Sequence, residues 1–113
     1  MAYIAKHKYA PMSASKARLV IDLIRGQLAN EALDILHFQP KRAARLIEKV
    51  IKSAVSNATF AGKRGDFLIT KACVDEADMY RRYRPEAKGR MHPILHRLCH
   101  ILVEVEPIED QPD

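Results

Sequence analysis

Apolar residues recur at helical spacing over residues 43–58, which is the clearest pattern along the chain. Positions three or four residues apart lie on one face of an α-helix. Many of them are alanines, so this helix can lie close against a sheet. Pro40 suits its first position, because the N–H that proline lacks would have no partner there. The predicted face consists of Ala43, Ala44, Ile47, Val50, Ile51, Ala54, Val55 and Ala58.

Two shorter helices are predicted before this one. The first covers residues 14–25, with Ser13 as a favourable N-cap and Gly26 just past its end. The second covers residues 31–38 and follows Asn30 as its N-cap. The first helix has an apolar stripe on one side, formed by Ala17, Val20, Ile21 and Ile24.

Strict alternation of apolar and other residues over 99–106 predicts a strand with one buried face. Residues 67–74 form a second strand-like run, and residues 3–10 alternate loosely before Pro11. A chain of 113 residues is expected to form one domain, residues 1–113. The predicted fold class is α+β: a small three-stranded antiparallel sheet packed with three helices, plus a long projecting β-hairpin.

The segment 79–97 is the predicted hairpin, because it has turn residues in its middle and strand-like runs on both sides. Its arms have few apolar residues, and a two-stranded ribbon alone is marginally stable in water. Arms of about ten residues would project roughly 30 Å. Five of the six basic residues from Arg81 to Arg97 are arginines, with Tyr80 and Tyr83 beside them. Arginine pairs with phosphate and tyrosine stacks on bases, which favours RNA around the hairpin over a solvated loop.

Charge is distributed unevenly along the chain, whose net charge is +5 and whose pI is about 9.4. Residues 1–25 contain five basic residues and one acidic residue, and residues 81–100 contain six and one. The last thirteen residues contain five acidic residues and no Lys or Arg. This segregation predicts a polyanionic partner for part of the surface, with the acidic C-terminal tail (107–113) kept away from it. A charged surface that only aids solubility is the alternative.

No apolar run is long enough to cross a membrane, and no signal-peptide core follows Met1, so we expect a cytoplasmic protein. Cys73 and Cys99 are interpreted as packing residues, since thiols stay reduced in that compartment.

Neither a metal site nor a catalytic site is predicted. On a strand, neighbouring members of the set His92, His96 and His100 would lie about 13 Å apart, too far to share one zinc ion. The acidic cluster at residues 75–78 has no accompanying nucleophile or phosphate-binding loop, and is interpreted as a charged strand edge or turn. We therefore expect no enzyme, no cofactor and no metal.

Three stretches carry a family resemblance. They are SASKARLV at 13–20 with DLIRG at 22–26; EAL at 31–33 through the third helix to SNA at 56–58; and RP at 84–85 with AKGR at 87–90, followed by HI at 100–101. Over residues 2–106 the chain resembles the bacterial L-twenty-two family of large-subunit ribosomal proteins.

The resemblance implies a structural protein of the large ribosomal subunit that binds and helps fold rRNA during assembly. The globular domain would lie near the exit of the nascent-peptide tunnel, and the hairpin would line the tunnel. Implied partners are large-subunit rRNA, the L-four family of ribosomal proteins at the tunnel constriction, and the nascent peptide. No membrane contact and no homo-oligomer are expected, and the implied location is cytoplasmic, in the ribosome.

Candidate rRNA contacts come from the charge pattern and from the resemblance together. The first helix is favoured because its basic residues begin at a helix N-terminus, which itself attracts phosphate. The basic side of the third helix, formed by Lys41, Arg45, Lys49 and Lys52, is equally consistent with an ordinary solvated face. The predicted rRNA-binding residues are Lys6, Lys8, Ser13, Lys16, Arg18, Arg25, Arg81, Arg82, Arg84, Lys88, Gly89, Arg90, Arg97 and His100.

The main rival is a free-standing regulator that binds duplex DNA. Such a protein needs a recognition helix with base-reading side chains, and usually a dimer surface. The first helix offers few such side chains.

Overall fold

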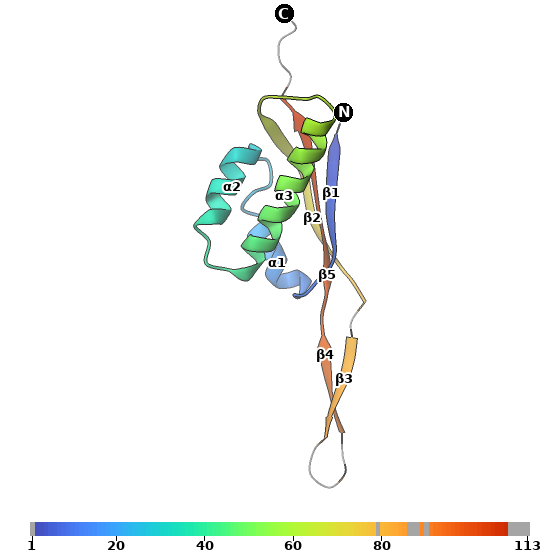
Figure 1. Ribbon diagram of the computed structural model, residues 1–113. Helices are drawn as coiled ribbons and strands as arrows, with labels where there is room; N and C mark the ends of the chain where they lie inside the picture. The colour runs from blue at the N-terminus through green and yellow to red at the C-terminus, as the bar shows by residue number, and fades with distance from the viewer. Residues whose placement is uncertain (1, 79, 86–88, 90, 109–113) are drawn as a thin grey trace, which may run out of the picture.

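The computed structural model of the chain describes residues 2–78, 80–85, 89 and 91–108, with side chains described outside residues 80–85 and 91–96. In this part of the chain, three helices lie beside a three-stranded sheet, and a hairpin extends away from both (Figure 1). In chain order the elements are β1 (Tyr3–Ala10), α1 (Ala14–Ile21), α2 (Ala29–His37), α3 (Arg42–Phe60), β2 (Phe67–Glu76), β3 (Tyr80–Pro85), β4 (Met91–His96) and β5 (Cys99–Pro107). The predicted fold class is confirmed.

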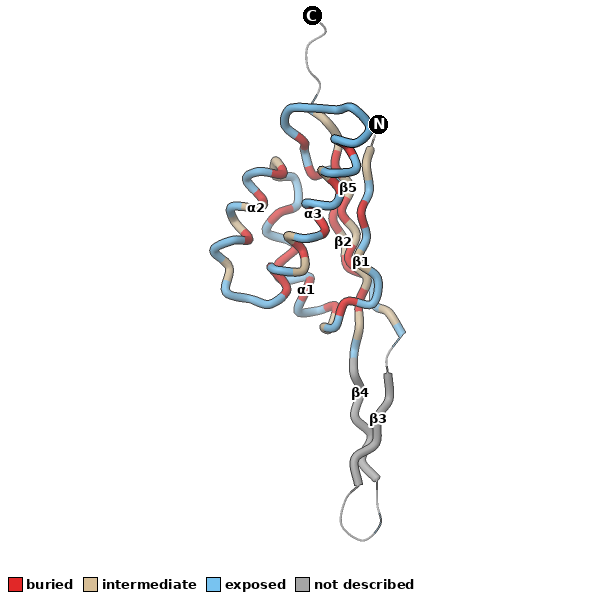
Figure 2. Tube along the Cα trace, in the orientation of Figure 1, coloured by how far each residue is buried: buried red, intermediate tan, exposed pale blue. Residues whose placement is uncertain are grey.

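The sheet is antiparallel and has the strand order β1-β5-β2, so β5 lies in the centre. The helices cover one face of this sheet (Figure 1). The alternation predicted for β5 is observed: Cys99, Ile101, Val103 and Val105 are fully buried, whereas the residues between them are partly exposed. Residues buried on the strands and on the inner sides of the helices form the core, as the burial colours of Figure 2 show.

The face predicted for α3 supplies the largest part of the helical side of this core. Seven of its eight residues are buried, and Val55 is half-buried against the core. Alanine side chains are small, so they let α3 approach β1 and β5 closely. The helix begins at Arg42, two residues after Pro40, with Lys41 in the N-cap position. The prediction that Pro40 begins the helix is therefore wrong by two residues.

The boundaries of the first two helices also differ from the prediction. α1 ends at Ile21 rather than Arg25, because the amides of Leu23 and Ile24 bond carbonyls three residues back and tighten the chain into turns. Gly26 follows with a φ of 81°, the left-handed conformation expected after a helix end. α2 begins at Ala29, before the predicted Asn30 cap, and Leu28 just ahead of it forms a bridge to β2.

β3 and β4 form the predicted hairpin. They pair antiparallel from Tyr80–His96 to Pro85–Met91. At the base of the hairpin, the amide of Ala77 donates to the carbonyl of Leu98 at 3.0 Å, which holds the two chain segments together where they leave the domain. The molecule measures 75 × 26 × 17 Å, a shape far longer than a compact domain of this length.

Two arginines fasten the α1 segment to the outer edge of β2. Arg18 donates from Nε and Nη2 to the carbonyl of Val74, at 3.1 and 2.8 Å. Arg25 donates from the same two atoms to the carbonyl of Ala72, at 3.1 and 2.7 Å. β2 is an edge strand, so these carbonyls have no strand partner on that side. The guanidinium groups satisfy them and fix the position of α1.

Cys73 and Cys99 lie on paired strands but do not face each other. The register places Cys73 opposite Leu102 and Cys99 opposite Glu76. Both thiols are free, and burial raises the pKa of the Cys99 thiol, an effect that the nearby Arg18 guanidinium opposes. Cys99 is a fully buried core residue, as predicted.

Replacing Arg18 or Arg25 by alanine is expected to lower the free energy of unfolding of the free protein by about 1–2 kcal/mol each, because β2 carbonyls lose charged donors. Urea denaturation measures this loss. Lys16→Ala is the matched control on α1: Lys16 is exposed and has no hydrogen bond among the described residues, so its change should stay within about 0.5 kcal/mol. Unchanged stability of Arg18→Ala would show that these bonds do not hold α1.

Candidate nucleic-acid interface

A hollow of about 370 Å³ lies where the hairpin leaves the domain, and we call it the hairpin-base hollow. Three parts of the chain form it: the start of α1, the end of β2, and the residues just before β5. It is lined by Ser13, Ala14, Ser15, Lys16, Arg18, Glu76, Ala77, Arg97 and Leu98. Four predicted rRNA-binding residues, separated by up to 84 positions in the sequence, thus come together here: Ser13, Lys16, Arg18 and Arg97.

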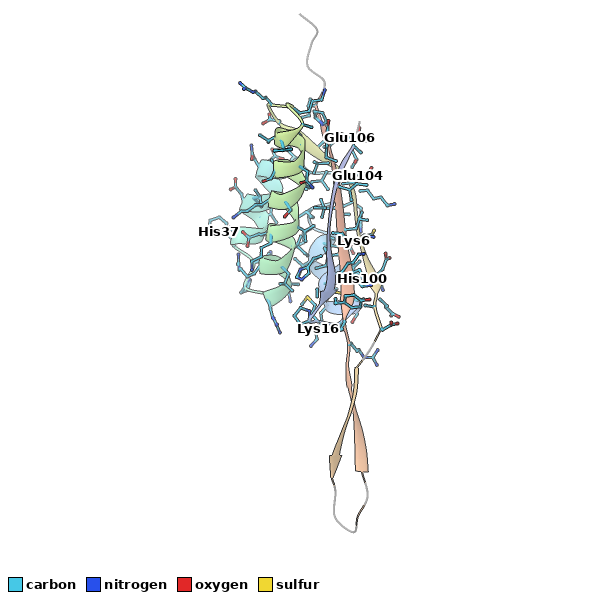
Figure 3. All side chains as sticks on the ribbon, turned by 45° about the vertical axis from the view of Figure 1, so that its right-hand side comes forward. Lys6, Lys16, His37, His100, Glu104 and Glu106 are labelled. Carbon is cyan, nitrogen blue, oxygen red and sulfur yellow. The ribbon has the colours of Figure 1, made fainter. Side chains whose placement is uncertain are left out.

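The start of α1 gives this hollow an electropositive wall. Ser13 occupies the predicted N-cap position with extended backbone, but its side chain caps no backbone amide and instead lies 3.4 Å from the Ser15 hydroxyl. The first amides of α1 therefore have no side-chain acceptor, and the helix dipole adds positive potential there. Lys16 lies in the first turn, at the hairpin end of the domain (Figure 3).

The cations of the hollow are not equivalent. Arg18 donates two of its five N–H groups to the Val74 carbonyl, so it also has a structural role in holding α1 to β2. Lys16 and Arg97 are exposed, and neither belongs to the two ion pairs found among the described residues. Glu76 is the one carboxylate among the described lining residues, so positive charge prevails. Sequence reasoning did not place Glu76 in an rRNA site, although its position at the end of β2 brings it there.

Arg25 is not part of the hairpin-base hollow. Its guanidinium bonds the Ala72 carbonyl and also pairs with Asp22 at 2.5 Å. The structural use of Arg18 and Arg25 was not predicted, since it depends on which strand lies beside α1. Their predicted rRNA contacts remain a prediction.

Lys6 and Lys8 lie on β1, away from the hairpin-base hollow; Figure 3 shows Lys6 part of the way up this strand. Both side chains are exposed.

His100 holds a bulge in β1, and its predicted rRNA contact remains a prediction. The register of β1 shifts between His7 and Ala10, and Tyr9 within this bulge has a φ of 58°, which residues with a side chain rarely adopt. The amide of Tyr9 donates to Nδ1 of His100 at 3.1 Å, so the imidazole replaces the ladder partner that the bulge removes. The two rings also pack edge to face, with centroids 4.8 Å apart. The unprotonated Nδ1 places the imidazole proton on Nε2.

The hairpin residues are placed by their backbone alone. Arg81, Arg82 and Arg84 lie on β3, opposite Leu95, Ile94 and His92. Gly89 is exposed and has a φ of 75°. The predicted contacts of Lys88 and Arg90 lie outside the described residues. The side chains of His92 and His96 also lie outside the part of the chain that is described.

The acidic residues Asp75 and Glu76 lie at the end of β2, opposite His100 and Cys99, and both are exposed. Asp78 follows the strand and is also exposed. The interpretation as a charged strand end is confirmed. Among the described residues, no helix combines the length and the apolar character that a membrane span requires.

The sequence model of the family described as "Ribosomal protein L22p/L17e" matches residues 5–106. The match includes α1, α2, α3, the hairpin, the whole of the hairpin-base hollow, and all of the sheet except Tyr3, Ile4 and Pro107. It confirms the resemblance predicted over residues 2–106, and the family is one of structural proteins rather than known enzymes. The chain therefore belongs to the ribosomal protein L22p/L17e family, and it is a structural protein of the large subunit of cytoplasmic ribosomes.

Proposed function

We propose that this protein binds large-subunit rRNA through the hairpin-base hollow and the projecting hairpin, and that it helps this RNA to fold during assembly. The observation that carries the proposal is the convergence of Lys16, Arg97 and the uncapped start of α1 at the root of the hairpin. A phosphate entering this hollow meets helix amides and two exposed cations. The same RNA strand can then continue along the hairpin.

The binding mechanism is charge neutralisation combined with recognition of folded RNA shape. Each cation that pairs with a phosphate releases a counterion, which makes binding strongly dependent on salt. Arginine contributes a planar fork that fits two phosphate oxygens, and lysine contributes a compact charge. The fixed positions of α1 and of the hairpin base make the phosphate spacing, rather than the base sequence, the feature that is recognised.

The extended hairpin is further evidence for binding to RNA. β3 and β4 pair with each other and extend away from the helices and from the three-stranded sheet (Figure 1). A ribbon of two strands is marginal in water, so surrounding RNA would stabilise it. We infer that the hairpin reaches the wall of the nascent-peptide tunnel, where its tip would meet an L-four family protein and the emerging peptide.

An integral protein of the large subunit is expected to stay on the particle through a high-salt wash. Tagged protein expressed in cells should co-sediment with large subunits in one-to-one amounts after this wash. Release into the soluble fraction would leave only peripheral electrostatic binding, and a free regulator that binds duplex DNA would become the better description. Comparable affinities of the free protein for rRNA and for random duplex DNA would support the same conclusion.

Removing the two exposed cations of the hairpin-base hollow, in a Lys16→Gln/Arg97→Gln variant, should weaken rRNA binding by at least tenfold. The slope of log affinity against log salt concentration should fall by roughly two, about one for each lost phosphate contact. Lys52→Gln/Arg64→Gln is the matched control, because it removes the same charges from exposed positions outside this hollow. Equal losses in both variants would mean that only net charge matters.

The hairpin tip should contribute to rRNA binding but not to folding. An Arg84→Ala/Lys88→Ala/Arg90→Ala variant is expected to have the same urea midpoint of unfolding as the wild type. In its folded state it should bind rRNA more weakly or perturb the tunnel. Circular dichroism during denaturation and affinity measurements on the same samples separate these effects. If this variant is unfolded as a free protein, the hairpin is part of the core and the projecting arrangement is wrong.

A further inference from the structure

The three-stranded sheet has one face that no described helix covers, and we call it the outer sheet face. The helices lie against the opposite face (Figure 1). Residues directly opposite each other in an antiparallel pair point to the same side of the sheet, so the register identifies the members of each face. None of the residues on the outer sheet face is buried. They are Ile4, Lys6, Leu68, Lys71, Cys73, Asp75, His100, Leu102, Glu104 and Glu106.

Apolar side chains lie in the middle of the outer sheet face. Leu102 on the central strand β5 is opposite Lys6 on one side and Cys73 on the other. Ile4 is a diagonal neighbour of Leu102, and its side chain is 49% exposed. An antiparallel sheet that presents one face to water alternates buried apolar residues with polar ones. An apolar centre surrounded by charged residues is instead the composition of a protein–protein interface.

The outer sheet face is acidic, although the chain as a whole is basic. Its two lysines and three carboxylates leave a net charge of −1, whereas the whole chain has a net charge of +5. Glu104 and Glu106 lie on the central strand, and neither belongs to the two ion pairs found among the described residues. An RNA backbone that approaches the middle of this face meets these carboxylates, which repel phosphate. The outer sheet face therefore disfavours RNA.

The two carboxylates differ in their neighbours within the sheet. A bulge in β2 between Ile69 and Lys71 brings Lys71 opposite Glu104, so this carboxylate has a basic neighbour in its own row. Glu106 lies opposite Leu68 instead, which supplies no charge. A partner that covers this face must therefore bring positive charge at least to Glu106, or leave a carboxylate unpaired in the interface.

The spacing along β5 defines the partner further. Glu106, Glu104 and Leu102 are two residues apart, so their side chains leave the strand at intervals of about 6.7 Å. An extended segment has the same interval between every second residue, and a helix has about 6 Å between residues four apart. A segment with two basic residues followed by an apolar one at this interval can face all three residues at once. Figure 3 shows Glu104 and Glu106 next to each other along the sheet.

We propose that the outer sheet face is the docking surface for a basic segment of a neighbouring protein of the large subunit. Lysine or arginine side chains of this segment pair with Glu104 and Glu106, and an apolar side chain covers Leu102. Complementary charge then fixes the register of the segment on the sheet. This inference goes beyond the proposed rRNA contacts, because it assigns a protein partner to the face that disfavours RNA.

Carboxylate labelling with a water-soluble carbodiimide and an amine tests this assignment. Three samples are compared: the free full-length protein, its complex with protein-free large-subunit rRNA, and intact large subunits. Glu104 and Glu106 should react in the first two samples and be protected roughly fivefold in the third, because only a protein partner excludes water from them. Acetylation of Lys16 in the same samples reports on the proposed rRNA site, and Lys16 should be protected in both the second and the third.

The outcomes separate the docking surface from the proposed function. Protection of Glu104 and Glu106 already in the rRNA complex would assign the outer sheet face to RNA and overturn the inference. Full reactivity in intact subunits would show a solvated face and also overturn it. If Lys16 reacts freely in the rRNA complex while the two carboxylates are protected only in subunits, the proposed rRNA site fails and the docking surface stands.

Zero-length carbodiimide cross-linking of intact subunits identifies the partner. Glu104 or Glu106 should be joined to a lysine of another ribosomal protein, and cross-links only within this chain would contradict the inference. In subunits that carry Glu104→Gln/Glu106→Gln, the amount of the cross-linked protein that remains after a high-salt wash should fall about fivefold. The free variant should bind rRNA within about twofold of wild type.

Glu31→Gln/Asp34→Asn is the matched control, because it removes the same two charges from exposed positions on α2. Subunits that carry this control should retain the cross-linked protein in wild-type amounts. Equal retention in both variants, or an equal loss in both, would show that Glu104 and Glu106 do not hold a partner.

Discussion

The central position of β5 is the constraint on which the rest of this structure depends. β5 alone pairs along both edges, with β1 on one side and β2 on the other, and its inward residues are fully buried beneath the helices. A one-residue slip in either pairing would turn those residues to the outer face of the sheet. Because β4 leads into β5 through two residues, the same strand that organises the core also sets the direction in which the hairpin leaves the domain.

A sheet with one central strand has two free edges, and the helices close each of them in part. Arg18 and Arg25 satisfy the carbonyls of β2, and Asn57 satisfies one carbonyl of β1. The hairpin-base hollow lies where this closure ends, at the end of β2. The proposed phosphate contact therefore lies next to the closed part of the β2 edge, where the first amides of α1 have no side-chain acceptor among the described residues and Lys16 is close by.

The sequence allowed prediction of the elements whose residues repeat with a period, because burial imposes that period directly. The α3 face and the β5 alternation are the clearest cases. It did not reveal the contacts that depend on which elements become neighbours. The early end of α1 follows from local turn bonds, and the role of His100 follows from a bulge in another strand. Of the candidate site, the convergence of Lys16 with Arg97 required the hairpin base to be placed beside α1.

The side-chain contacts also change how the high content of arginine and lysine is interpreted. Three of the six arginines whose side chains are described, Arg18, Arg25 and Arg45, donate to main-chain carbonyls of this protein, so part of the arginine count serves folding. A guanidinium group suits this role, because its fork reaches a carbonyl with two donors. Lys16 has no such bond among the described residues, and it lines the hairpin-base hollow. At the hairpin-base hollow, RNA affinity should therefore depend more on Lys16 and Arg97 than on Arg18, whose guanidinium group already bonds a carbonyl of this protein.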